Sequence, residues 1–307
     1  MTPLKNLLVA LDLTEIDEVL IRYTAFLSSQ PAIEKVYFVH VSKHSDVPDE
    51  VLHSFGQANL PADATIKERI EESVRAHFAG VPHVHTEVHM LEGTPFKELL
   101  RLCKQQDIDL LVVGRKLRLR GSGALSHKLL RTGRLSVLFV PETAEPKLNR
   151  IVVSIDFSDY SMLALDQVLH SALARPEMEI ICMHVYEVPT GYITLGISYE
   201  EFEERMRGFA KEKFEHVLAR FPELRSRASL KLVKQEQMDD VGELVVLEAK
   251  RAKADMLAIG AQGKSATALF VLGSVTEKVL DDDTDIPLIV FKKKDEEVGF
   301  LDALIGG

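Results

Sequence analysis

The sequence predicts an α/β protein made of two doubly wound domains, each a five-stranded, mainly parallel sheet with helices on both faces. Three observations lead to this fold class: the chain length, an internal repeat, and short apolar runs that alternate with helical patterns. The chain has 307 residues, and an average domain has about 150. Two domains are therefore expected.

The internal repeat consists of five blocks that recur in the same order, 144 to 151 residues further along the chain. The blocks pair residues 6–14 with 150–158, 36–41 with 180–185, 109–114 with 255–260, 123–130 with 273–280, and 136–140 with 287–291. Five blocks in one order indicate a duplicated unit. We expect one domain at residues 1–142, a second at 148–293, and a C-terminal tail at 294–307.

The repeated blocks are mostly short, nearly continuous apolar runs, which is typical of parallel strands buried on both faces. Further strands are expected near residues 84–91 and 229–236. The segments with a helical pattern are 16–29, 64–78, 95–106, 160–175, 200–221 and 241–252. Strands that alternate with helices predict right-handed crossovers and an open parallel sheet.

The composition excludes several kinds of partner. The chain carries 47 acidic and 37 basic residues, a net charge of -10, so we expect no binding to nucleic acid or to an anionic membrane. The apolar stretch 7–11 is too short for a signal peptide or a membrane span. The two cysteines, Cys103 and Cys182, cannot form a disulfide framework, which fits a cytoplasmic location.

The ends of the strands are where a ligand is expected, because open α/β sheets bind ligands beyond the carboxyl ends of their strands. In the second half, Asp156 follows the first strand, Val185 lies at the end of the second, and Gly260 ends the fourth. His40 and His184 occupy equivalent strand-end positions, and we expect each of them either to pack there or to form a strand-end hydrogen bond.

A glycine-bearing loop follows Gly260 and leads into a helix that starts near Ser274. Glycine lets the backbone approach a phosphate closely, and the free N–H groups at a helix N-terminus favour an anion. Lys264 adds a positive charge to this loop. The pattern predicts a phosphate-binding site in the second half.

The loop resembles the ATP-binding signature of the universal stress proteins. Its spacing is Gly-x2-Gly-x9-Gly-Ser, from Gly260 to Ser274. The runs 152–165 (VVSIDFSDYSMLAL) and 286–292 (IPLIVFK) are also similar to that family. The similarity covers essentially the whole chain as a tandem pair, and it implies a Rossmann-like fold for each half.

The resemblance implies an ATP site, with or without Mg²⁺, in the second domain of a stress-response protein. It assigns Asp156 and the Val185 backbone to the adenosine end, and Gly260 and Gly263 to the ribose and phosphates. The residues that it assigns to the phosphate tail are Gly273, Ser274, Val275 and Thr276. Many family members are dimers, so a homodimer and a monomer with paired halves both stay open.

The first half departs from this signature. The loop after its fourth strand reads RKLRLR at 115–120, with Leu117 in place of the second glycine, and Ala124 replaces the serine. Asp12 and Val41 are retained, so we expect the adenosine end without the phosphate cradle. The basic cluster is either a solvated loop or a site for a different anion.

Three other short motifs occur in the sequence. Residues 263–265 (GKS) are not a P-loop, because the first glycine of that motif would fall on Ala258. His83, His85 and His89 alternate with Glu87 between them, and they form either a zinc site or a polar strand face without metal. The acidic run 281–283 is expected to be a solvated turn.

The sequence predicts a nucleotide sensor or regulator rather than an efficient enzyme, and it assigns no catalytic residue. Phosphoryl transfer needs magnesium carboxylates and a positioned base, whereas the loop region offers hydroxyls, at Ser265, Thr267, Ser274 and Thr276. One alternative is slow ATP hydrolysis or self-phosphorylation. The other is a scaffold that binds no nucleotide, with Met256 or Phe270 filling the adenine space.

Overall fold

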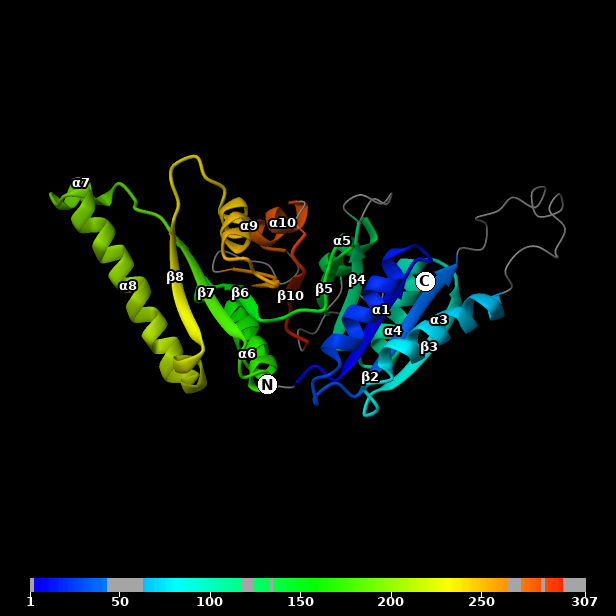
Figure 1. Ribbon diagram of the computed structural model, residues 1–307. Helices are drawn as coiled ribbons and strands as arrows, with labels where there is room; N and C mark the ends of the chain where they lie inside the picture. The colour runs from blue at the N-terminus through cyan, green and yellow to red at the C-terminus, as the bar shows by residue number, and fades with distance from the viewer. Residues whose placement is uncertain are drawn as a thin grey trace. The chain divides into compact units, whose positions relative to one another are not determined.

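The computed structural model describes residues 3–42, 63–116, 124–132, 135–263, 272–282 and 285–294. The chain divides into two compact units. The described residues of one unit run from 3 to 146 and include Lys294, and the other unit is Lys147–Lys293. Each unit is a parallel sheet covered by helices (Figure 1), which confirms the predicted fold class.

The first unit contains five strands in the order β3-β2-β1-β4-β5, and every neighbouring pair is parallel. Its strands are β1 (Asn6–Leu11), β2 (Lys35–Ser42), β3 (His85–Glu92), β4 (Leu110–Arg115) and β5 (Ser136–Pro141). Its helices are α1 (Ile16–Leu27), α3 (Asp63–Phe78), α4 (Pro95–Gln105) and α5 (Ala124–Thr132). Helix α1 packs beside α3 and α4 beside α5, as right-handed crossovers in opposite directions require.

The second unit repeats this topology, with parallel strands in the order β8-β7-β6-β9-β10. Its strands are β6 (Arg150–Ser154), β7 (Glu179–Tyr186), β8 (Ala228–Lys234), β9 (Met256–Gly260) and β10 (Leu288–Phe291). Its helices are α6 (Asp159–Leu173), α7 (Gly191–Leu195), α8 (Tyr199–Arg220), the 3-10 helix η2 (Pro222–Ser226), α9 (Val241–Arg251) and α10 (Ser274–Asp281).

The strands are the buried centre of each unit, because their apolar runs face helices on both sides. Leu7, Leu8 and Val9 of β1 are fully buried, and so are Val152 and Val153 of β6. The six predicted helices have boundaries within two residues of those observed. The short helix α7 was not predicted, because its five residues are too few for a helical period to show in the sequence.

The duplication extends to backbone geometry and hydrogen bonds. At the start of the first strand, Asp109 accepts two backbone N–H groups at 2.8 and 2.9 Å, and Asp255 does the same in the second unit at 2.8 and 2.9 Å. Leu13 and Phe157, which follow the first strand of each unit, both have a left-handed backbone with φ of 61° and 63°. The first strand therefore ends in the same way in both units.

The helices of the second unit begin in two different ways. Ser158 caps α6, Ser198 caps α8 and Asp240 caps α9, each with a side-chain oxygen that accepts a backbone N–H. Helix α10 instead begins after Gly273, which has no side chain to serve as a cap. The N–H groups of its first turn are therefore not capped from this position.

Candidate functional site

A cavity of about 270 Å³ lies at the carboxyl ends of β6, β7 and β9, and we call it the strand-end cavity. It lies where the strand order reverses, since β7 is added on one side of β6 and β9 on the other. Ligands of open α/β sheets bind at such a point.

Eight of the nine residues predicted from the sequence line the strand-end cavity. They are Asp156, Val185, Gly260, Gly263, Gly273, Ser274, Val275 and Thr276. The ninth, Lys264, lies outside the described residues, as do Ser265, Thr267 and Phe270. Met256 is buried at the start of β9 and does not line the cavity.

Two glycines bring the backbone close to its neighbours at this site. A Cβ atom at Gly260 would lie 2.7 Å from the carbonyl carbon of Tyr160, and one at Gly263 would lie 2.8 Å from Asp156 Oδ2. The other carboxylate oxygen of Asp156 accepts the N–H of Ser158 at 3.0 Å. Glycine at 263 therefore leaves room for the Asp156 carboxylate in its observed position.

The first turn of α10 presents backbone N–H groups beside the cavity, as a phosphate site requires. Ser274 is exposed and Thr276 is buried. The Thr276 hydroxyl donates to the carbonyl oxygen of Gly260 at 2.9 Å, so it is engaged within the protein. Thr276 can therefore offer a ligand its N–H group rather than its hydroxyl.

His184 also lines the strand-end cavity. Its Nδ1 atom is 2.8 Å from the carbonyl oxygen of Ile155, and its ring centroid is 4.7 Å from that of Phe157. In the first unit, Nδ1 of His40 is 3.1 Å from the carbonyl oxygen of Leu11. Both histidines therefore make the strand-end contact that the sequence predicted.

The prediction from sequence missed several other lining residues. They are Ser154, Ile155, Ser161, Val241, Ile259 and Gln262, besides His184. Most of them flank a predicted residue at a strand end, so the strand-end rule could have included them. Ser161 and Val241 come from the first turns of α6 and α9, and only the fold brings these helix starts to the cavity.

In the first unit, the residue equivalent to Asp156 is Asp12, and a lysine side chain pairs with it. Lys116 Nζ forms an ion pair with Asp12 Oδ2, and the Lys116 side chain is 14% exposed. Burial raises the pKa of Asp12, but hydrogen bonds from Lys116 and Thr14 outweigh it and hold the pKa below its usual value. Arg118, Arg120 and Leu117 lie outside the described residues.

Asp17 lies next to this ion pair, and its pKa is raised. Its carboxylate accepts the N–H groups of Asp12 at 3.1 Å and Leu13 at 2.8 Å. Burial raises the pKa of Asp17 to about 6, although these two hydrogen bonds oppose the shift. The residue at the equivalent place in the second unit is Ser161, 144 positions later.

The histidine motif divides between two places. His85 and His89 each place Nε2 3.1 Å from a carboxylate oxygen of Glu87, whereas His83 Nε2 is 3.4 Å from the carbonyl oxygen of Gln30. Within the described ranges, no group of three or more His, Cys, Asp or Glu side chains is arranged to hold a metal ion. Of the acidic run, Asp281 ends α10 and Asp283 lies outside those ranges.

None of the helices in the described part of the chain is long and apolar enough to cross a membrane.

Comparisons with known proteins match both halves of the chain. The model of the universal stress protein family matches residues 3–141 and 147–292. The chain is 32% identical to universal stress protein YxiE of Bacillus subtilis over 150 residues, which is 46% of this chain and 98% of that protein. It is 26% identical to universal stress protein MJ0531 of Methanocaldococcus jannaschii over 149 residues, 48% of this chain and 84% of that protein.

The fold also matches a solved structure. A universal stress protein from Archaeoglobus fulgidus superposes with a TM-score of 0.62 over 94% of this chain and 98% of that chain, at 16% identity. This likeness concerns the fold, whereas the family model matches the sequence of both halves. The chain therefore belongs to the universal stress protein family.

Proposed function

We propose that the second unit binds an adenine nucleotide, in the first instance ATP, and that the chain acts as a nucleotide-dependent sensor or regulator in a stress response. The observation that carries this proposal is the strand-end cavity, which gathers, at the reversal of strand order, eight residues that the resemblance assigns to the nucleotide.

The chemistry of the lining residues fits the two ends of a nucleotide. The uncapped first turn of α10, after Gly273, offers N–H groups and a favourable dipole to the phosphates. Asp156, at the far end, is a hydrogen-bond acceptor for a ribose hydroxyl or an adenine amino group. The volume of about 270 Å³ is close to the lower end of the range for ligand cavities, about 300 Å³, and suits the nucleoside part.

The lining residues support binding more than catalysis. Among those that the structure describes, Asp156 is the only carboxylate, and the proposal assigns it to the adenosine end. A phosphoryl-transfer site needs carboxylates that hold Mg²⁺ and a group that positions the nucleophile. Mg²⁺ bound with ATP would neutralise phosphate charge. We include a cytoplasmic location in the proposal because the chain is acidic and both cysteines are free.

Calorimetric titration with ATP tests the proposal through two matched variants. Asp156→Asn should weaken ATP binding by about tenfold, or ~1.4 kcal/mol, because the carboxylate loses an acceptor oxygen and its charge. Asp12→Asn makes the same change at the equivalent place in the first unit and should leave ATP binding unaltered. Absence of binding to the wild type, or equal losses in both variants, would overturn the assignment.

A Gly263→Arg variant and a phosphate-release assay complete the test. The arginine should abolish ATP binding, because even a Cβ atom at this position meets Asp156 Oδ2 at 2.8 Å. At high protein concentration, the rate of phosphate release from ATP should equal the rate measured without protein. Turnover that Gly263→Arg abolishes would establish an ATPase in place of a binding module.

A further inference from the structure

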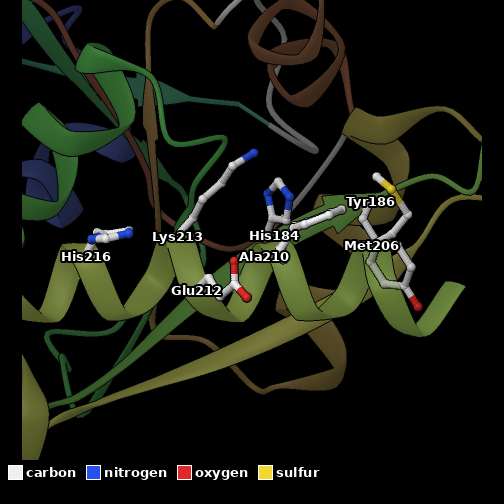
Figure 2. Close-up of a pocket in the computed structure, with 8 residues that line it drawn as sticks. His184, Tyr186, Met206, Ala210, Glu212, Lys213 and His216 are labelled. Carbon is white, nitrogen blue, oxygen red and sulfur yellow. The ribbon is translucent and has the colours of Figure 1, made fainter. Parts of the chain in front are cut away.

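A second cavity, of about 350 Å³, lies between α8 and β7, and we call it the α8 cavity (Figure 2). Tyr186 of β7 and Met206, Phe209 and Ala210 of α8 give it mainly apolar walls. Phe209 and Ala210 follow Met206 by three and four residues, so all three lie on one side of the helix. This volume lies within the range for small-molecule sites, about 300–1,000 Å³.

The apolar walls of the α8 cavity leave aromatic surface open to solvent. Phe209 is 52% exposed. Covering its ring would contribute about 25 cal/mol of favourable free energy for each Å² of apolar surface removed from water. The Tyr186 hydroxyl donates to Glu203 Oε1 at 2.8 Å. The polar end of Tyr186 is thereby engaged within the protein, and only 6% of the residue is exposed.

One ammonium group lies at the edge of the α8 cavity without a carboxylate partner. In the part of the chain that the structure describes, no Asp or Glu oxygen lies within 4 Å of Lys213 Nζ, which instead lies 5.9 Å from the centroid of the Phe157 ring. In Figure 2, Lys213 and His184 extend to the same side of α8, whereas the Glu212 carboxylate turns away from them. The cavity therefore combines apolar walls with an available positive charge.

We propose that the α8 cavity binds a small amphipathic anion, an aromatic or short acyl group that carries one acidic substituent. The apolar part packs against Met206 and Phe209, and the acidic group pairs with Lys213. This site is distinct from the strand-end cavity, although His184 lines both. The inference does not depend on nucleotide binding.

The first test uses 8-anilinonaphthalene-1-sulfonate, an aromatic anion whose fluorescence rises in apolar sites. Lys213→Glu should weaken its binding by about tenfold, because an attraction becomes a repulsion. Lys211→Glu is the matched control: it makes the same charge change on an exposed lysine of α8 that does not line the cavity. The control should bind the dye like the wild type.

The second test locates the dye by NMR of ¹³C-labelled methionine methyl groups. The Met206 signal, assigned through Met206→Leu, should shift on addition of the dye in the wild type and not in Lys213→Glu. Met238 is 96% exposed and lies outside the cavity, so its signal should not move.

Three outcomes would overturn the inference. Equal losses of dye affinity in Lys213→Glu and Lys211→Glu would show that the dye responds only to the overall charge of α8. Equally tight binding of uncharged N-phenyl-1-naphthylamine would refute an anion site. Loss of dye binding in Asp156→Asn would place the dye in the strand-end cavity. Dye binding that depends on Lys213 would support the α8 site even in a protein that fails to bind ATP.

Discussion

The Thr276 hydroxyl donates a 2.9 Å hydrogen bond to the carbonyl oxygen of Gly260. This bond joins the first turn of α10 to the last residue of β9, the two elements that border the strand-end cavity on one side. Both groups are buried, so the bond is shielded from competition by water. It fixes where the N–H groups of the helix lie relative to the strand end.

Thr276→Val should destabilise the second unit while it leaves the shape of the side chain unchanged. The Gly260 carbonyl would lose a buried partner, which costs about 1–3 kcal/mol. Urea denaturation measures this loss. Ser274→Ala, on the exposed side of the same turn, should change stability by less than about 0.5 kcal/mol. Equal stability of the two variants would contradict the structural role of Thr276.

Alanine substitutions at two glycines of the strand-end cavity should affect different properties, stability at Gly260 and ATP binding at Gly273. At Gly260 a Cβ atom would meet the Tyr160 backbone at 2.7 Å, so Gly260→Ala should cost about 1–3 kcal/mol of stability. At Gly273 the nearest atoms are 3.5 Å away, and Gly273→Ala should fold normally. Its methyl group should weaken ATP binding, because it keeps phosphate from the backbone. Thermal unfolding and calorimetry separate the two effects.

Asp17 should make the first unit less stable as the pH rises from about 4 to 6. Its pKa is about 6 in the folded chain against an ordinary 3.8, so the folded state binds the proton more tightly than the unfolded state. The stability from this group is full below pH 3.8 and is lost as the pH rises through 6.

Asp17→Ser, which introduces the residue found at the equivalent position 161, isolates this contribution. The stability difference between wild type and variant should change by about 1–3 kcal/mol from pH 4 to pH 7, in favour of the wild type at the lower pH. Urea denaturation across this range measures it. Parallel pH profiles for the two proteins would show that Asp17 is not responsible.

Cys103 and Cys182 should be unreactive in the folded chain. Burial raises the pKa of each thiol to about 12, so only about one thiol in ten thousand is a thiolate near pH 8. Ellman's reagent should detect no rapid reaction in the native protein and both thiols in concentrated guanidinium chloride. Rapid reaction of either thiol in native protein would contradict the burial described.

The sequence predicted the strands and eight of the residues that line the strand-end cavity, because these depend on short runs of residues. A buried parallel strand leaves an apolar run, and the residue after it, such as Asp156, falls at the ligand-binding edge whatever the loops do. The glycine spacing then located the start of α10.

The features that the sequence did not predict depend on contacts between distant residues. Lys116 meets Asp12 from 104 positions away, and nothing local to either residue indicates the pair. The α8 cavity forms because α8 packs on the sheet so that Met206 and Phe209 lie near Tyr186 of β7. In the sequence, α8 is a strongly charged helix whose few apolar residues give little sign of a cavity.

The ion pair between Lys116 and Asp12 bears on how the chain would respond to changing ligand concentration. In the first unit the Asp12 carboxylate is already paired with the Lys116 ammonium group. Its equivalent in the second unit, Asp156, lines the strand-end cavity. The proposed function gives each chain one nucleotide site, in the second unit, and occupancy of one such site follows a simple hyperbola because no second nucleotide site in the same molecule can sharpen it. A steep, switch-like response would require several chains to act together.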